Sequence, residues 1–585
     1  MKTSFHRFCS FYLQGKCKSP GGSSGSTEDS VRSIHRAIFS LFCRERRIGL
    51  EKRVVSIFAG ILLALFLCEL NLYSAVSGEE LRQAAQAQSQ WTLDIAQTRG
   101  TIYDCRLHPL TGGKSKYVAA VAPSMESLSA LNRMFTASEM KDIRELFDAG
   151  RPFLLEVPQK IEAEGMDVFQ ISGRYRENPL AVHVLGYVDS EGNGMAGAEL
   201  AYDQYLKAHQ GEISVTYQVD ALQRQLEGKG RIVTNTAYKG TAGVVLTLDE
   251  KIQEIAEAAA SKYLDEGAVV IGEIPSCSLR AVVSVPGFSQ ENPSASMEDP
   301  DSPFLNRAFN AYSVGSVFKL VSATAALEYG ISPDTQYICM GAIPVSSSYF
   351  HCFNGQSHGT ETMKEAIANS CNTYFVNLMQ GVPQSRFLET ARSLGFGEEL
   401  ELMPGCISAA GVLPSMETLQ YPKGLANASF GQGELTATPV QITAMLNTIA
   451  SGGIYAEPRL YEGIVDDTQE FLERAALTEK RRVMSEETAS FLQSCMIASA
   501  EDGTSSRGNP EEAGGAGAKT ATAQTGRYKD DGEEIVQCWY VGFWPKENPH
   551  YVITVFEEDG EGGGATCGPV FKEIAEELYT LSGAE

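Results

Sequence analysis

Apolar and polar residues alternate with different periods along this chain, and the changes of period divide it into regions. Residues 54–73, "VVSIFAGILLALFLCELNLY", form an apolar run whose only charge is Glu69. About 20 apolar residues suffice to cross a bilayer as a helix, so this run predicts a transmembrane helix. Residues 1–53 show no sustained apolar period and include the Gly/Ser-rich "SPGGSSGSTEDS", so we expect a mostly flexible tail.

After the apolar run, the pattern predicts two regions of mixed helix and strand. Residues 74–243 combine short helical patterns with strands such as "EISVTYQVD", which indicates an elongated α+β pedestal. Residues 244–585 begin with a strand, "GVVLTLD", and an amphipathic helix, "EKIQEIAEAAASKYL". The strands "GAVVIGEI" and "LRAVVSVPG" follow and predict a hairpin.

The rest of the last region returns to strands only near its end. A mainly helical stretch continues to about residue 500 and is followed by the strands "KTATAQTG", "EIVQCWYVGFWP" and "HYVITVFEE". A last helix, "PVFKEIAEELYTL", closes the chain. Strands at both ends with helices between them predict one antiparallel sheet that is covered by helices and interrupted by a large helical insertion.

The charge distribution orients the predicted transmembrane helix. The net charge of the chain is -25, yet residues 1–53 hold 11 Lys or Arg against 4 Asp or Glu. Basic residues immediately before the apolar run predict a cytoplasmic N-terminus and an exported body. A cleaved signal peptide is the alternative, because "AVS" at residues 75–77 resembles a cleavage site, but the preceding segment is too long for a normal leader. The acidic body makes nucleic acid an unexpected partner.

The cysteines leave several states open. Nine of the 13 cysteines follow the apolar run, and an odd number cannot all pair within one chain. Cys339 and Cys352 are the best candidates for a disulfide, because an exported protein meets an oxidising environment. His351 and His358 nearby allow a metal site as the less favoured alternative; paired ligand spacing is missing, so we expect no metal. Unpaired thiols are the third alternative.

Residues 306–330, "NRAFNAYSVGSVFKLVSATAALEYG", combine a helix that is apolar almost all round with two reactive side chains. We expect Gly330 to end this helix. Ser316 follows Gly315 and should lie in the first turn, where free backbone N–H groups favour an oxyanion. Lys319 lies one turn later on the same face. If burial or another cation holds its amine neutral, it can take the proton of the serine.

Two more short motifs follow in order along the chain. Residues 370–372 read "SCN", an S-x-N, and residues 519–521 read "KTA" on a predicted strand. The order S-x-x-K, S-x-N, K-T-G marks penicillin-binding proteins and serine β-lactamases. Each motif alone has a bland interpretation, as a helix cap, a snorkelling lysine or an exposed edge strand. The ordered set is the specific signal, and Ala521 in place of glycine is its one departure.

Further stretches extend this resemblance: "TRGTIYD", "GYVDSEGNGMAGAEL", "LNRAF", "FGQGELTATPVQ" and "WYVGFWP". Over residues 90–580 the chain resembles the class B, monofunctional penicillin-binding proteins. The resemblance implies a membrane-anchored α+β protein with a dimerisation-type pedestal over residues 74–243. Residues 244–585 are then the transpeptidase domain, with a five-stranded antiparallel sheet.

The same resemblance implies a serine D,D-transpeptidase that cross-links peptidoglycan stem peptides outside the cytoplasmic membrane and is inhibited by β-lactams. No glycosyltransferase domain precedes the pedestal, so we expect a membrane glycosyltransferase as partner. No cofactor is implied. Arg99, Asp104 and Glu199, in the pedestal stretches, are expected to form a structural ion-pair group, and "FGQGELTATPVQ" to shape the floor of the site.

The resemblance also assigns roles to the motif residues. Ser316 is expected to attack the substrate carbonyl, with Lys319 as its base. Ser370 is expected to relay a proton between Lys319, Lys519 and the leaving nitrogen. Asn372 is expected to hold the Lys319 amine and the stem-peptide amide.

The K-T-A strand is expected to complete the site. Lys519 adds positive charge that keeps Lys319 deprotonated, and with Thr520 it should bind the terminal carboxylate of the substrate. The backbone N–H groups of Ser316 and Thr522 are expected to form the oxyanion hole.

Because Ala521 stands where the family has glycine, the sequence does not decide whether the protein is catalytically active. On strand alternation it shares a side with Lys519 and faces the helix of the serine, where the family glycine leaves room. We therefore expect either an active transpeptidase or a catalytically impaired homologue that acts as a scaffold or sensor. A D,D-carboxypeptidase shares the three motifs and stays a further alternative.

Overall fold

The computed structural model describes residues 54–73, 89–226, 230–476, 480–529 and 531–584. The predicted tail, residues 1–53, lies outside the described residues. The chain divides into two units, Met1–Gln90 and Trp91–Glu585. In the first, Val54–Tyr73 is a helix with all of its side chains exposed. Among the described residues it is the one helix long and apolar enough to cross a membrane, as the apolar run predicted.

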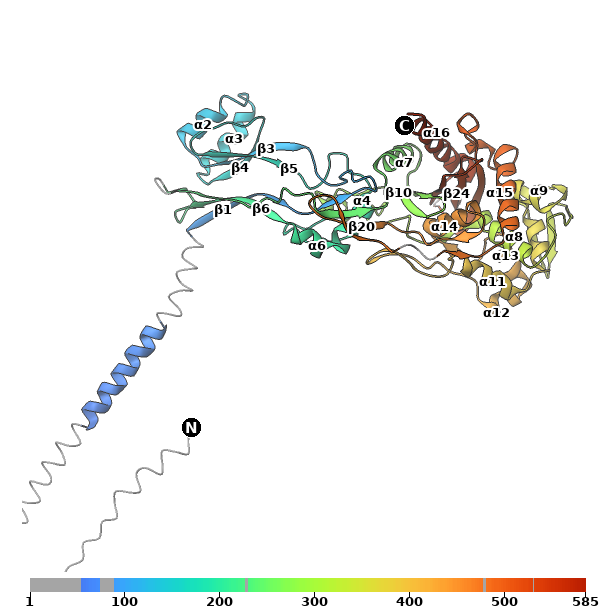
Figure 1. The fold of residues 1–585 in the computed structure, drawn as a ribbon, viewed down its shortest axis with the longest axis horizontal. Helices are drawn as coiled ribbons and strands as arrows, with labels where there is room; N and C mark the ends of the chain where they lie inside the picture. Colours follow the sequence, from blue (N-terminus) through green and yellow to red (C-terminus); the bar gives the residue numbers. More distant parts are fainter. Residues whose placement is uncertain (1–53, 74–88, 227–229, 477–479, 530, 585) are drawn as a thin grey trace, which may run out of the picture. The chain divides into compact units, whose positions relative to one another are not determined.

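Two three-stranded sheets begin the second unit (Figure 1). The first has the order β1-β6-β7, with bounds Gln90–Thr98, Gly211–Gln218 and Ile232–Asn235, and β6 is the predicted "EISVTYQVD" strand. The second has the order β4-β3-β5, with bounds Phe153–Val157, Ser115–Val121 and Met166–Ser172. Alternate residues of β3 enter two cores. Val118 and Ala120 pack with the first sheet, whereas Ala119 and Val121 pack with α2, Met125–Leu131, and α3, Glu139–Asp148.

A buried group of ion pairs lies in the pedestal. Glu199, on α5 (Gly197–Ala201), has a fully buried side chain. Its carboxylate lies 3.2 Å from Nε of Arg99 and 2.6 Å from Nε of Arg174, and Arg99 also pairs with Asp203 at 3.1 Å. The expected structural group is thus confirmed for Arg99 and Glu199. Asp104 lies apart from it and accepts hydrogen bonds from two backbone N–H groups of its own turn.

A four-stranded sheet joins the pedestal to the C-terminal region. Its order is β2-β8-β20-β21, with bounds Thr101–Tyr103, Gly243–Leu246, Tyr461–Val465 and Phe471–Arg474. β2 and β8 run parallel, and β20 is antiparallel to β8. The backbone hydrogen bonds of this sheet therefore cross the position, near residue 243, where the sequence predicted a domain boundary. The short helices α4, Val182–Leu185, and α6, Asp203–Ala208, lie in the pedestal region.

The C-terminal region is built on the predicted five-stranded antiparallel sheet. Its order is β10-β9-β25-β24-β23, with bounds Ser278–Val285, Gly267–Glu273, Tyr551–Glu557, Glu534–Trp544 and Gly517–Tyr528. The predicted hairpin, β9 and β10, joins three strands from the end of the chain through the pairing of β9 with β25. The α+β fold class is confirmed.

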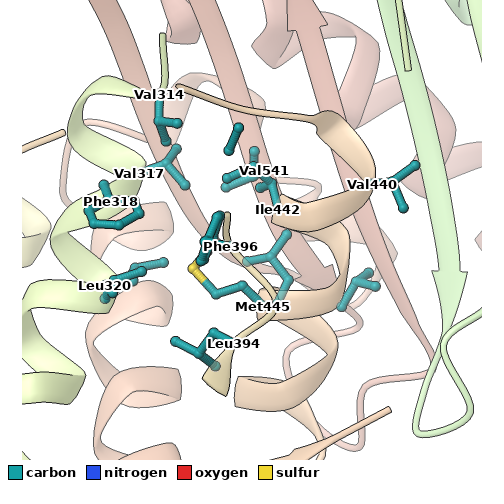
Figure 2. Packing of buried hydrophobic residues seen from close by; sticks show 14 of the residues in the cluster. Val314, Val317, Phe318, Leu320, Leu394, Phe396, Val440, Ile442, Met445 and Val541 are labelled. Atoms are coloured by element: carbon teal, nitrogen blue, oxygen red, sulfur yellow. The ribbon is translucent and has the colours of Figure 1, made fainter. Parts of the chain in front are cut away.

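Strand alternation divides the core around this sheet into two layers. On β24, Cys538, Tyr540 and Trp544 pack with α7, Glu250–Tyr263, and α16, Gly568–Ala584. Trp539, Val541 and Phe543 face the other way, toward α8, Lys319–Glu328, and α14, Pro439–Ala450. Figure 2 shows this second layer, where Val541 lies in one core with Val317, Phe318 and Met445. The turn and helix that carry the predicted reactive residues therefore pack between the sheet and the other helices of the insertion.

The insertion between β10 and β23 is mainly helical, as predicted, with small two-stranded sheets between its helices. Its remaining α-helices are α9 Met363–Ala368, α10 Asn372–Met379, α11 Gln384–Ser393, α12 Met416–Gln420, α13 Pro422–Ser429 and α15 Glu486–Glu501. Its strand pairs are β11 Tyr312–Ser313 with β18 Thr436–Ala437, β12 Tyr337–Cys339 with β15 Gly359–Glu361, β13 Ala342–Val345 with β14 Ser348–His351, β16 Leu400–Met403 with β17 Cys406–Ser408, and β19 Ile454–Tyr455 with β22 Arg481–Arg482.

Substitution of Glu199 tests the buried ion-pair group. Glu199→Gln leaves the guanidinium groups of Arg99 and Arg174 buried with less compensating charge, so the full chain should lose about 3–5 kcal/mol of stability, measured by urea unfolding. The control is Glu156→Gln, which removes an exposed pair with Lys116 in the same region and should cost less than about 1 kcal/mol. Equal losses for the two variants would contradict a structural role specific to the buried group.

Candidate active site

Ser316 lies in a tight turn that leads into α8. Gly315–Phe318 form one turn of 3-10 helix, and Lys319 begins the α-helix. Val317 and Phe318 are fully buried in the core that Figure 2 shows. Because these apolar neighbours fix the turn, Ser316 keeps its partial exposure while Lys319, one turn on, is drawn completely inside.

The Lys319 side chain ends in a ring of polar contacts. Its Nζ lies 2.6 Å from the carbonyl oxygen of Ser370 and 2.7 Å from Oδ1 of Asn372. The hydroxyl oxygens of Ser316 and Ser370 are 3.0 Å and 3.1 Å away. The carbonyl and the amide oxygen can only accept hydrogen bonds. A neutral amine has two hydrogens for them and keeps its lone pair for a hydroxyl proton, so the ring suits an uncharged lysine.

Burial is the main reason why this amine can be neutral. It lowers the pKa of Lys319 from its usual value to about 7, because a buried ammonium loses its hydration. Cys371, Cys352 and Glu361 oppose this and raise the pKa of Lys319. The pKa of Lys519 lies well below its usual value, first through burial and then through the charge of Lys319. Burial and the charge of Lys519 were both expected to keep Lys319 neutral, and burial is the leading cause.

Ser370 has a left-handed backbone, with φ +57, and follows Asn369, the C-cap of α9. Its N–H donates to the carbonyl of Ile367, and that of Cys371 donates to Ala366, the two bonds of a Schellman motif. Glycine is usual at this position, and a serine there costs about 1–2 kcal/mol. In this conformation the carbonyl and hydroxyl oxygens of Ser370 both contact the Lys319 amine. Backbone strain is thus concentrated at the centre of the site, as is common in active sites.

Lys519 reaches the same hydroxyl from the sheet. Its Nζ is fully buried and lies 3.0 Å from Oγ of Ser370 and 2.8 Å from the carbonyl oxygen of Thr520. The Ser370 hydroxyl therefore lies between two amines, each with a lowered pKa. A hydroxyl in that place can accept a proton from one side and donate one to the other.

Asn372 is held at both ends of its amide. Oδ1 accepts from Lys319, and Nδ2 donates to the carbonyl oxygen of His351 at 2.9 Å. The structure therefore brings together the five residues that the three motifs nominated: Ser316, Lys319, Ser370, Asn372 and Lys519.

The K-T-A strand forms one wall of the site, because β23 is the edge strand of the sheet. Thr520 Oγ1 lies 3.2 Å from Thr504 Oγ1, and Thr522 Oγ1 accepts from the N–H of Gly563 at 3.2 Å. Alternate N–H groups of an edge strand point away from its single partner. The oxyanion hole that the sequence predicts needs a backbone N–H of this kind at Thr522.

Ala521 faces the serine turn, as its alternation with Lys519 predicted. A Cβ atom on Gly315 would lie 3.3 Å from that of Ala521 and 3.0 Å from that of Ala523. Gly315 has φ +60, a conformation that also favours glycine. The Ala521 methyl thus occupies space next to a residue without a side chain, while Lys519 on the same strand keeps its contact with Ser370.

The "FGQGELTATPVQ" segment packs against the turn that carries Ser316. Gly315 donates its N–H to the carbonyl of Gly431 at 2.9 Å, and a Cβ on Gly431 would lie 1.9 Å from the Gly315 carbonyl oxygen. Thr438 caps α14, and the side-chain amide of Gln441 donates to three backbone carbonyls. These contacts agree with the predicted structural role of this segment.

The structure brings the sulfurs of Cys339 and Cys352 together without a bond between them, and their disulfide stays a prediction. The two sulfurs lie 3.7 Å apart, far beyond the roughly 2.05 Å of an S–S bond, and both cysteines are free thiols. Cys339 also contacts Nδ1 of His358, and Cys352 contacts the sulfur of Cys371. His351 contributes its backbone carbonyl to the active site instead. Sequence reasoning missed Cys371, although it is the middle residue of the S-x-N motif.

Comparison with known proteins gives the site a context. Residues 267–576 match the family described as "Penicillin binding protein transpeptidase domain". Stage V sporulation protein D of Bacillus subtilis is 27% identical over 571 residues, which cover 91% of this chain and 86% of that protein. Peptidoglycan D,D-transpeptidase PbpA of Mycolicibacterium smegmatis is 29% identical over 350 residues, which cover 55% of this chain and 70% of PbpA.

The fold is also similar to that of a solved chain. That solved chain belongs to a peptidoglycan synthase complex, for which structural coordination of polymerization and crosslinking is described. The TM-score is 0.64 with 24% sequence identity, and the match covers 90% of this chain and 98% of that one. The similarity spans the pedestal as well as the five-stranded sheet.

The contact between Ala521 and Gly315 predicts that Ala521 is tolerated. Ala521→Gly should lower stability by about 0.5–1 kcal/mol, since glycine weakens a strand. It should change the rate of labelling by a fluorescent penicillin by less than about threefold, or about 0.6 kcal/mol of barrier. Ala523→Gly on the same face is the matched control for stability. A gain in labelling rate of more than tenfold for Ala521→Gly alone would show instead that the methyl obstructs the site.

Proposed function

This chain belongs to the penicillin-binding protein transpeptidase family, in its class B group, and on that premise we propose that it is a peptidoglycan D,D-transpeptidase working through a serine acyl-enzyme. The observation that carries this proposal is the contact of one buried amine, that of Lys319, with the hydroxyls of Ser316 and Ser370. The inhibition by β-lactams that the resemblance implies belongs to the same proposal, since a β-lactam carbonyl would acylate the same serine.

In the first half-reaction Ser316 attacks the carbonyl of the penultimate D-Ala of a stem peptide. The Oγ–C bond forms while the Ser316 proton moves to the neutral amine of Lys319. The amide C–N bond then breaks, and the proton passes through the Ser370 hydroxyl to the nitrogen of the departing D-Ala. The two hydrogen-bonded amines on either side of Ser370 support this relay.

In the second half-reaction the amine of a neighbouring strand attacks the acyl-enzyme. Its nitrogen forms the new amide bond and gives up a proton, and the Ser316 oxygen recovers one as the ester breaks. The same groups act in reverse. The carbonyl oxygen becomes negative in both halves, and the N–H groups of Ser316 and Thr522 are the proposed donors to it.

The K-T-A strand is proposed to hold the substrate. Lys519 supplies positive charge near the terminal carboxylate, and the Thr520 hydroxyl supplies a hydrogen bond. Asn372 already donates from Nδ2 to a carbonyl, that of His351, and a stem-peptide carbonyl is the same type of acceptor. The substrate would then lie antiparallel or parallel to the free edge of β23, as an added strand.

We place the enzyme at the cytoplasmic membrane, anchored by Val54–Tyr73 with its N-terminus in the cytoplasm and the catalytic region outside. A membrane glycosyltransferase is the proposed partner, because cross-linking needs newly made strands. The similar fold found in a peptidoglycan synthase complex supports a partner of that kind.

Two other functions are distinguished by product. A D,D-carboxypeptidase would transfer the acyl group to water, whereas a transpeptidase transfers it to an added amine acceptor and forms a dimeric stem peptide. A catalytically impaired scaffold would not be acylated at all. The connected contacts from Ser316 to Lys519 favour an active site over a scaffold.

Loss of the nucleophile tests the acyl-enzyme directly. The full chain should be labelled covalently by a fluorescent penicillin, and Ser316→Ala should abolish the label, read on a denaturing gel and by mass spectrometry. Ser322→Ala is the matched control, because Ser322 lies on the same helix but donates to the carbonyl of Ser429 outside the site, so its label should persist. Labelling of Ser316→Ala, or none of the wild type, would refute the proposal.

The pH dependence of acylation tests the base. Because the base must be the neutral amine, and the pKa of Lys319 is lowered to about 7, the second-order rate with a penicillin should rise with pH and level off above about 7. Below that, it should fall about tenfold per pH unit, with an apparent midpoint that belongs to the Lys319–Lys519 pair. A midpoint near the usual lysine pKa would contradict burial as the activating factor.

A further inference from the structure

Three cysteines and one histidine converge beside the S-x-N motif. The sulfurs of Cys339, Cys352 and Cys371 and a ring nitrogen of His358 all lie within 4.8 Å of one another. The three cysteines are at most 2% exposed, and the His358 side chain is 8% exposed. The proposed transpeptidation uses none of the four side chains. Their types, Cys₃His, form one of the usual ligand sets of a structural zinc ion.

The spacing of these atoms suits a tetrahedral metal ion. Ligands at the usual Zn–S length of about 2.3 Å place two sulfurs about 3.8 Å apart along a tetrahedron edge. Cys352 Sγ lies 3.7 Å from Cys339 Sγ and 3.8 Å from Cys371 Sγ. The third contact, from Cys339 Sγ to His358 Nδ1, is 3.3 Å. Two of the three sulfur–sulfur separations are therefore those that zinc requires, and the third lies within 4.8 Å.

The surroundings of the cluster also call for a cation. The side chain of Glu361 is 2% exposed, and its Oε2 has no hydrogen-bond partner, although it lies 3.8 Å from Nδ1 of His358. Its other oxygen accepts from Asn369. Such an unpaired buried carboxylate oxygen is costly unless positive charge is near. The hydroxyl of Thr373 lies 3.4 Å from Cys371 Sγ and 3.7 Å from Cys352 Sγ, the kind of second contact that supports thiolate ligands.

The four residues come from separate segments of a part of the insertion that is built of short strands. Cys339 ends β12, Cys352 follows β14, and His358 precedes β15. Each of these strands has three or four residues and pairs in a two-stranded sheet, which is marginal without further support. Cys371 is the N-cap of α10, where its sulfur accepts from the N–H of Tyr374 at 3.4 Å. One ion bound by all four would join both two-stranded sheets to α10.

We propose that Cys339, Cys352, Cys371 and His358 bind a structural zinc ion that fixes the loop carrying Ser370 and Asn372. Cys371 lies between these two residues, so the ion restrains the backbone of the S-x-N motif on both sides. This positioning role rests on the proposed function, whereas the metal site itself does not.

A disulfide is the competing use of the same sulfurs. Cys352 is close to both other cysteines, so an oxidised protein would join it to one of them. That bond would consume two of the three sulfurs and leave a buried thiol, His358 and the unpaired Glu361 oxygen without a shared role. The zinc site uses all of these groups, which is why we favour it.

Metal analysis of the full chain tests the site. The protein is purified in detergent, with a reductant and without a chelator. Elemental mass spectrometry should then find about one zinc ion per chain. Cys352→Ser and His358→Gln should each lower the content by more than half, whereas Cys495→Ser, a buried cysteine on α15, should leave it unchanged. Cobalt should replace zinc and give the absorption of a tetrahedral cobalt–thiolate centre.

Because a ligand variant can fail for lack of folding, the wild type decides the question. Absence of zinc after purification, together with no uptake of added Zn²⁺ by reduced protein, would overturn the site. So would a Cys339–Cys352 or Cys352–Cys371 disulfide found by non-reducing peptide mapping of protein kept under native conditions.

The positioning role has its own readout. Removal of zinc by a chelator should lower the rate of labelling by a fluorescent penicillin about tenfold, and added Zn²⁺ should restore it. An unchanged rate in zinc-free protein would overturn the positioning role while the metal content still stands. Absence of labelling in zinc-loaded wild type would refute the proposed function and leave the metal site intact.

Discussion

The chemistry of this protein depends on keeping one amine out of water. Lys319 is drawn inside because the residues around it on α8 are core residues, and its Nζ then meets two oxygens that can only accept hydrogen bonds. Burial moves its pKa to about 7, into the range where a lysine can serve as a base. Without the packing shown in Figure 2, the same residue would be an ordinary charged lysine.

The fold delivers the partners of this amine from distant parts of the chain. Ser316 comes with the turn that leads into α8, Ser370 from the turn between α9 and α10, Asn372 from the start of α10, and Lys519 from the edge strand β23. The two ends of the domain pair in one sheet, and the insertion packs on it. The site therefore forms only when the whole domain has closed, which ties catalytic competence to correct folding.

The backbone of the S-x-N turn is strained, and several contacts hold it in that conformation. Ser370 adopts a left-handed conformation that is unfavourable for its type, and two buried lysines hold its oxygens. The Schellman bonds hold it from the α9 side, and on the α10 side the Cys371 sulfur caps the helix by accepting from the N–H of Tyr374. A turn restrained from several directions can keep a hydroxyl in place between two amines, which a flexible loop would not do.

Much of this protein was determined by local sequence. The apolar run at residues 54–73, the hairpin, the three late strands and α16 follow from periodicity, and the five catalytic candidates follow from ordered motifs, because these signals are encoded within a few residues. Contacts between distant segments are not encoded in that way. Only the tertiary structure decided that a sheet crosses residue 243 and that Gly315 is the residue that the Ala521 methyl meets. It also brought Cys371 and His358 together with the predicted Cys339–Cys352 pair, since irregular spacing along the chain says nothing of which side chains meet once the insertion has folded.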